Sequence, residues 1–211
     1  MKTNTPTRFT DRDFPIHSNE SSPAASQEAL QWYQANFGMT PNLAGVMAES
    51  PALLLSYWQT QNNLLQRGSL TPREVNIVET VVAHHNRCQY CVAGHTAFGT
   101  TPVFGNTQEE LQAIRNDADL GDAKLNALRD FTLLVLEKRG RMAVSQLNTF
   151  LAQGYTRAHA LDVIACLAAK VMSNFANQLA LTPIDAAFAP LAEGLPYREE
   201  RTEKIISEVV M

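Results

Sequence analysis

The sequence predicts an all-α fold formed by a single helical domain, and three observations lead to this prediction. Apolar residues recur at helical spacing along most of the chain, and helix-start signals such as Thr71-Pro-Arg-Glu74 precede several of these stretches. No segment shows the alternation of a half-buried strand, and no hairpin dipeptide is present. Hydrophobic residues make up 45% and charged residues 18% of the 211 residues, which is the composition of a globular chain.

The two ends of the chain differ in composition from the helical domain. Residues 1–25 are expected to form an extended N-terminal arm, because prolines occur there among Thr, Ser and Asn and apolar side chains are few. The helical domain is then expected over residues 26–193, followed by a charged C-terminal tail over residues 194–211. The apolar residues of the arm are Phe9, Phe14 and Ile16, and those of the tail are Ile205, Ile206, Val209 and Val210.

Within the domain, helices are expected from their capping residues and apolar faces. Two capping boxes, Thr71–Glu74 and Thr107–Glu110, mark clear starts. A short apolar turn is expected after Pro41. In chain order, the expected helices begin at Ser26, Pro51, Pro72, Cys88, Thr107 and Ala123, near Leu147, and at Thr156. The last of these is the longest, and one of its sides carries Leu161, Ile164, Ala168, Val171, Phe175 and Leu179.

Charge and hydropathy argue against several classes of partner. The formal net charge is −4 and no basic stripe is present, so a nucleic-acid partner is not expected. No apolar run approaches the roughly 20 residues that span a bilayer, and the polar N-terminus lacks a signal core. We therefore expect a cytoplasmic protein without a membrane partner. Three cysteines are too few for a disulfide framework, so the C-x-x-C pair indicates redox or metal chemistry.

The candidate site is the segment that contains Cys88, Cys91 and His95. If Cys88 begins a helix, the two cysteines lie one turn apart and can form a disulfide, while the His95 imidazole can lie beside Cys91. The positive end of the helix dipole would lie near Cys88. These effects favour the thiolate, which attacks peroxides and disulfides. Oxidation of one cysteine to a sulfenic acid and capture by the other would complete a turnover.

The same residue types allow other interpretations. C-x-x-C with a nearby histidine is also metal-ligand spacing, and His84 or His85 could supply a fourth ligand, although no second ligand pair follows. Tyr90, between the cysteines, is expected to be part of a wall rather than a catalyst. Cys166 lies in an apolar run and is expected to be a core residue.

The segment Leu70-Thr-Pro-Arg-Glu, the apolar helix after it and the block Cys88-Gln-Tyr-Cys91-Val-Ala-Gly-His95-Thr-Ala-Phe-Gly99 resemble the AhpD-like alkylhydroperoxidase group of the carboxymuconolactone decarboxylase family. The resemblance extends from about residue 51 to residue 189. It implies an all-α fold and a peroxidase-related thiol oxidoreductase that reduces peroxides or disulfides, with Cys88, Cys91 and His95 as catalytic residues. His95 would polarise Cys91, the attacking sulfur, and Cys88 would resolve it, although the helix-terminus effect leaves the reverse order open.

The resemblance also implies partners. Family members are homo-oligomers, often trimers or hexamers, and a dimer is a further option for this chain. Electrons would come from an external thiol, a lipoyl group or a peroxiredoxin-linked partner, and no bound cofactor or metal is expected. Two alternatives remain: a carboxymuconolactone-decarboxylase-type enzyme, against which the C-x-x-C argues, and a non-enzymatic metal-binding or redox-sensing helical protein.

One position departs from the family pattern. The family usually has a proton-transferring glutamate twelve residues before the first cysteine, where this sequence has Asn76. An amide cannot take up a proton at neutral pH. Glu79 lies three residues later on the same expected helix face, so it is the candidate replacement, acting as a general base with a pKa raised by partial desolvation. The alternative is that Glu79 is an ordinary solvated acid on the helix surface.

Overall fold

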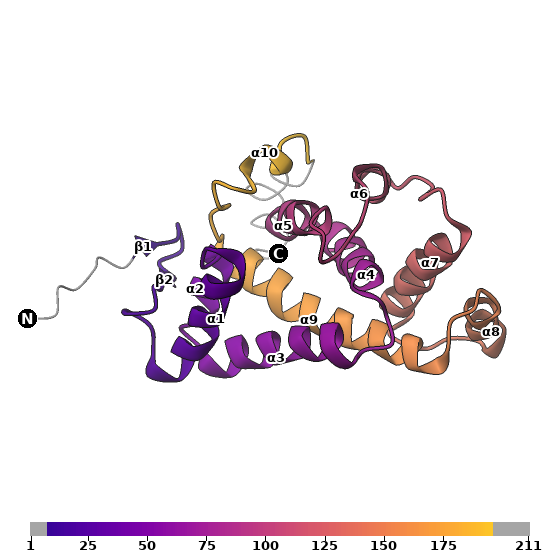
Figure 1. Ribbon diagram of the computed structural model, residues 1–211, viewed down its shortest axis with the longest axis horizontal. Coiled ribbons are helices and arrows are strands. Elements are labelled where there is room, and N and C mark those ends of the chain that lie inside the picture. Colours follow the sequence, from indigo (N-terminus) through magenta and orange to yellow (C-terminus); the bar gives the residue numbers. More distant parts are fainter. Residues whose placement is uncertain (1–7, 196–211) are drawn as a thin grey trace, which may run out of the picture.

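The computed structural model describes residues 8–195, and most of them are helical (Figure 1). The predicted all-α class is confirmed. The predictions for the first seven residues of the arm and for the apolar cluster of the tail lie outside the described residues. The helices are α1 (Gln27–Phe37), α2 (Asn42–Met47), α3 (Pro51–Arg67), α4 (Pro72–His85), α5 (Gln89–Gly99), α6 (Gln108–Arg115), α7 (Ala123–Lys138), α8 (Val144–Ala152), α9 (Arg157–Ala180) and α10 (Ala189–Ala192).

The helix starts follow the predicted capping residues. Ser50 accepts a hydrogen bond from the Leu53 amide at the start of α3. Thr71 forms a complete capping box with Glu74 at the start of α4, and a second box begins α6 at Thr107. Each such cap stabilises its helix by about 1 kcal/mol. The starts of these helices are therefore specified by the local sequence.

The arm and the segment after Pro41 differ from the predictions. Two-residue strands β1 (Arg8–Phe9) and β2 (Pro15–Ile16) pair antiparallel within the arm. The expected turn is the short helix α2, whose six residues are all buried. The arm passes close to α2 at Gly45, where an added Cβ would lie 2.8 Å from the carbonyl oxygen of His17. Ile16 is consequently buried against the α2 residue Val46.

Helix α4 is the central element of the domain. Every residue from Glu74 to Ala83 is buried, because α3, α5, α6, α7 and α9 all pack against this helix (Figure 1). One apolar cluster lies toward α1, α2, α3 and α5, and a second lies toward α7, α8 and α9. The C-x-x-C belongs to the first cluster and Cys166 to the second.

Helix α9 exposes a strip of large apolar residues and buries a strip of polar residues beside its buried apolar ones. All six predicted apolar-face residues are exposed. The five large ones form a strip, the outer row, made up of Leu161, Ile164, Val171, Phe175 and Leu179. The opposite side contacts α3 and α4 and contains a polar strip, the inner row, made up of Lys170, Asn174 and Asn177, each at most 1% exposed. An ordinary amphipathic helix, by contrast, turns its large apolar residues to the core and its polar residues to solvent.

The length of α9 also modifies an expectation about membranes. Its 24 residues, with a mean hydropathy of 1.2 over the best window, make it long and apolar enough to cross a bilayer by length and composition. The sequence had been expected to hold no segment of this kind. A helix with a buried lysine and buried asparagines against α4 has, however, the character of a packed domain helix.

Candidate active site

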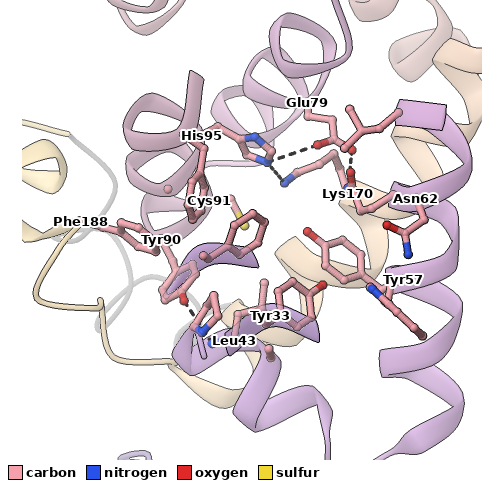
Figure 2. Close-up of a pocket in the computed structure, with 18 of the residues that line it drawn as sticks. Tyr33, Leu43, Tyr57, Asn62, Glu79, Tyr90, Cys91, His95, Lys170 and Phe188 are labelled. Atoms are coloured by element: carbon pink, nitrogen blue, oxygen red, sulfur yellow. Dashed lines mark hydrogen bonds and ion pairs between the residues drawn. The ribbon is translucent and has the colours of Figure 1, made fainter. Parts of the chain in front are cut away.

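A mostly apolar cavity of about 110 Å³ lies between α1, α3, α4, α5 and α9 (Figure 2). Apolar cavities of similar size hold a benzene ring. Its polar lining includes Gln61, Asn62, Glu79, Cys91, His95 and Lys170. Its aromatic lining consists of Trp32, Tyr33, Phe37, Tyr57, Trp58, Tyr90, Phe98, Phe104 and Phe188.

The turn between α4 and α5 places the two cysteines. Arg87 adopts a left-handed conformation with φ of 53°, and the Cys88 amide donates to the carbonyl of Ala83. Cys88 is therefore the N-cap of α5, as the spacing predicted, and Cys91 lies in the first turn. Both are free thiols. Cys91 lines the cavity, whereas Cys88 is fully buried behind it, so a ligand in the cavity meets Cys91 first.

The surroundings of Cys91 favour its thiolate. Burial alone would raise the pKa of Cys91, but the hydrogen bond with Cys88 and the charge of Lys170 outweigh it, and the pKa falls to about 6. Asn177 donates its amide to the Cys91 sulfur at 3.2 Å, and Asn174 acts in the same direction. Burial and the hydrogen bond with Cys91 raise the pKa of Cys88 well above its usual value. The two cysteines therefore differ, with the thiolate favoured at Cys91 and the thiol favoured at Cys88.

His95 is held between two elements. Its Nδ1 lies 3.0 Å from the Asn76 Oδ1 and its Nε2 lies 2.6 Å from the Lys170 Nζ. A lysine ammonium can only donate, so Nε2 is the acceptor and Nδ1 carries the proton. Burial and the nearby Lys170 charge lower the pKa of His95 well below its usual value. His95 is therefore a neutral imidazole, and the positive charge near Cys91 comes from Lys170.

Glu79 is buried at the same end of the cavity as His95 (Figure 2). Its Oε2 lies 3.5 Å from the His95 Nε2, and its Oε1 accepts a hydrogen bond of 2.6 Å from Gln61. Burial raises the pKa of Glu79 to about 7, against the opposing effects of Lys170 and Gln61. The interpretation of Glu79 as a solvated surface acid is therefore wrong, since the side chain is 3% exposed.

Asn76, at the family's glutamate position, contacts the other edge of the imidazole. It is fully buried, and its amide nitrogen donates to the Asn106 side chain at 3.0 Å. Asn76 does not line the cavity, whereas Glu79 does. The two residues flank His95 from the same face of α4, as their spacing predicted, with Asn76 holding the ring and Glu79 facing the ligand space.

The other residues singled out from sequence lie at or beyond the cavity edge. Tyr90 forms part of the wall, and its hydroxyl accepts from the Leu43 amide at 3.1 Å and donates to Asp185. His84 lies 3.2 Å from Asp117, outside the cavity. Within residues 8–195, no group of three or more His, Cys, Asp or Glu side chains is arranged to hold a metal ion.

Sequence reasoning missed Lys170, Asn174 and Asn177. They follow the cysteines by about 80 residues, and no spacing rule connects the two segments. The available signal was their mutual spacing of four and three residues, which places three polar side chains on one face of an otherwise apolar helix. A polar strip on an apolar helix indicates a buried polar site.

Fold and site together define an AhpD-like all-α domain with a C-x-x-C beside an aromatic cavity. Residues 51–133 match the model of the Carboxymuconolactone decarboxylase family, a segment that contains Glu79, Cys88, Cys91 and His95. The predicted family resemblance is thereby confirmed. A search of curated protein sequences finds no significant match.

Solved structures support the same fold. The AhpD core structure of an uncharacterized peroxidase-related protein from Ralstonia eutropha JMP134 is 21% identical, with a TM-score of 0.74, covering 83% of this chain and 93% of that chain. A peroxidase-related protein from Silicibacter sp. TM1040 is 19% identical, with a TM-score of 0.71 and coverage of 88% and 97%. The debrominase Bmp8 is 15% identical, with a TM-score of 0.64 and coverage of 84% and 94%. At sequence identities of 15–21%, the similarity to these solved structures establishes the fold alone.

Proposed function

We propose that this protein is a thiol-dependent oxidoreductase that reduces a peroxide or a disulfide through Cys91 and Cys88. The observation that carries the proposal is a thiolate-favouring cysteine at the cavity surface with a second, protonated thiol directly behind it. A structural cysteine pair needs neither the difference in pKa nor access to a cavity. The family match supports an enzyme of this group.

The proposed reaction with a hydroperoxide has two steps. The Cys91 thiolate attacks one peroxide oxygen, the O–O bond breaks, and the leaving alkoxide takes a proton from the Glu79 carboxyl group. Cys91 is then a sulfenic acid. The Cys88 sulfur attacks the Cys91 sulfur, water leaves with the Cys88 proton, and a disulfide forms. A two-electron donor outside the chain, such as a thiol, a lipoyl group or a peroxiredoxin-linked partner, restores both thiols.

The direct test is a turnover assay with several hydroperoxides and several reductants, combined with peptide mapping after one equivalent of peroxide. The proposal requires a Cys88–Cys91 disulfide with Cys166 left as a thiol. Zinc analysis of protein purified under reducing conditions addresses the metal-binding alternative. One tightly held zinc per chain, together with no turnover, would support that alternative instead.

The aromatic lining leads to an expected substrate preference. Burying a benzene-sized ring contributes about 2 kcal/mol, so kcat/KM for cumene hydroperoxide should exceed that for hydrogen peroxide by about tenfold or more. Phe37→Ala, at the partly exposed edge of the cavity, should reduce this ratio. Phe9→Ala, which removes a phenylalanine exposed on the arm, is the matched control. Equal kcat/KM values for the two peroxides would contradict an aromatic substrate site.

The same aromatic lining favours a second candidate function, reductive dehalogenation of a small aromatic ring. The structure of a Bmp8 cysteine-to-alanine variant in complex with 2,3,4-tribromopyrrole has the same fold, with a TM-score of 0.66 at 15% identity. In this chain the Cys91 thiolate would take the bromine while the ring carbon takes a proton, and the Cys88 thiol would then displace bromide from the Cys91 sulfur to leave a disulfide. Bromide release from a bromopyrrole in the presence of a thiol, lost in Cys91→Ser, would distinguish this activity from peroxide reduction.

We also propose that the protein is a homo-oligomer in which a second copy covers the outer row of α9. This row extends over roughly 27 Å of helix, and its large apolar side chains are 41–67% exposed. Light scattering should give a multiple of 23.3 kDa. Phe175→Asp with Leu179→Asp should lower the mass, while Val103→Asp, at an exposed apolar position off α9, should not. A monomer at micromolar concentration in the unmodified protein would contradict the proposal.

A further inference from the structure

Lys170 is only 1% exposed and lies among the residues that surround the candidate site. Burying an ammonium group is costly unless nearby groups compensate for the lost hydration. The closest acceptor is the neutral His95 Nε2, at 2.6 Å (Figure 2). A neutral imidazole satisfies one N–H bond but does not balance the charge. The balancing negative charge must come from an anion nearby, and the candidates are Cys91 and Glu79, both of which are affected by the Lys170 charge.

The rest of the inner row points to Cys91 as that anion. Asn177 donates its amide nitrogen to the Cys91 sulfur at 3.2 Å. Asn174 accepts a hydrogen bond of 2.9 Å from Asn86 through its oxygen, which fixes the orientation of its amide. Its buried nitrogen has no conventional hydrogen-bond partner within the described residues. Amide donors directed at one sulfur suit an anion, because a thiolate is a stronger acceptor than a thiol.

We propose that the inner row of α9, made up of Lys170, Asn174 and Asn177, is a positioning element that keeps Cys91 ionised as a thiolate in the reduced protein. By doing so it selects Cys91 over Cys88 as the attacking sulfur. Lys170 supplies the electrostatic effect on Cys91 that the sequence pattern assigned to His95. The selection of an attacking sulfur rests on the proposed function, whereas the ionisation of Cys91 can be measured without any substrate.

The other ionisable groups near Cys91 do not provide this charge. From α4, Glu79 is an acid, which carries no positive charge in either protonation state. From α5, Cys88 is a protonated donor and His95 is neutral. Burial raises the pKa values of the three cavity phenols above their usual value, so that these side chains stay neutral; they are Tyr33 on α1, Tyr57 on α3 and Tyr90 on α5. Among the described groups named here, Lys170 is therefore the source of positive charge.

The test is the pH dependence of Cys91 alkylation by iodoacetamide in fully reduced protein, followed on the Cys91 peptide by mass spectrometry. Lys170→Met should raise the midpoint by at least about one pH unit, so that the rate at pH 6 falls several-fold. Lys170→Arg should keep most of the low midpoint, because it keeps the charge. Lys138→Met, at an exposed position at the end of α7, is the matched control and should leave the midpoint unchanged.

Two further variants separate the charge from other effects. Asn177→Leu removes the donor to the sulfur and should raise the midpoint by less than Lys170→Met does. His95→Ala should leave the midpoint nearly unchanged, since the imidazole is neutral. Thermal melting establishes that each variant is folded, and Asn177→Leu keeps the proposal testable if Lys170→Met does not fold.

An unchanged midpoint in folded Lys170→Met would overturn the proposal, as would a larger shift in His95→Ala than in Lys170→Met. If neither Lys170→Met nor Asn177→Leu moved the midpoint, the inner row would have no electrostatic role. A low Cys91 midpoint that depends on Lys170, in a protein that turns over no peroxide, disulfide or halide, would instead contradict the proposed function and leave the inference standing.

Discussion

Cys91→Ser is expected to lower the rate of the protein's reaction with hydroperoxide by on the order of 10³-fold or more, because a serine hydroxyl stays protonated at neutral pH and is a poor nucleophile. Cys88→Ser should retain the first step, within about tenfold, and then stop at the sulfenic acid. The two variants are therefore expected to differ in which step they block. The different positions of Cys91 at the cavity and Cys88 behind it are the structural reason.

Single-turnover kinetics can follow the first step through the tryptophan fluorescence of Trp32 and Trp58, which line the cavity. A dimedone-type reagent should trap the sulfenic acid in Cys88→Ser and not in Cys91→Ser. Cys166→Ser, which changes a thiol in the other apolar cluster, is the control and should react like the unmodified protein. Sulfenic acid formed on Cys88 in the Cys91→Ser variant would reverse the assigned order.

Glu79→Gln is expected to slow thiol oxidation by about 10²-fold, the usual scale for losing a group that transfers a proton in the rate-limiting step. The first step needs Cys91 deprotonated and Glu79 protonated. Because the pKa values are about 6 for Cys91 and about 7 for Glu79, the rate should rise with pH near 6 and fall near 7. In Glu79→Gln the falling limb should disappear, since an amide does not titrate in this range.

The pH dependence of thermal stability tests the raised pKa of Glu79 independently of kinetics. A carboxyl whose folded pKa of about 7 lies above its unfolded value of 4.5 stabilises the fold while protonated, and this contribution is lost as pH rises through 7. Glu79→Gln should therefore melt higher than the unmodified protein at pH 8 and about equally at pH 5. Glu109→Gln, at an exposed acid on α6, is the control for both measurements. Oxidation of Glu79→Gln at the unmodified rate across pH 6 to 9 would mean that His95 or Lys170 delivers the proton.

The part of the site that sequence could predict is the part formed by neighbouring helices. Glu79, Cys88, Cys91 and His95 lie within 17 residues on α4 and α5, so helical spacing and the turn between the two helices bring them together. The helix starts were predictable for a similar reason, since capping boxes such as that of Thr71 act within one turn. Their roles in catalysis remain predictions.

The part that sequence could not predict depends on tertiary packing. Local periodicity identifies an apolar side on α9 but does not tell whether it faces the core or the solvent, and here it faces outward. The polarisation of Cys91 was assigned to His95, because an imidazole four residues along a helix lies beside the sulfur. Packing of α9 brings Lys170 to the imidazole and keeps His95 neutral. The helix α2 was missed because its six buried residues are stabilised by surrounding helices rather than by a side-chain cap.

The distance in sequence between the thiols and the inner row has a consequence during biosynthesis. Lys170 is the 79th residue after Cys91, so at 5–20 residues per second the ribosome adds it roughly 4–16 s later. During that interval the nascent chain carries two cysteines that lack the groups which lower the pKa of Cys91. The thiol would acquire its reactivity only when α9 docks, so an unfinished chain would be spared from oxidation by the substrate that we propose for the finished protein.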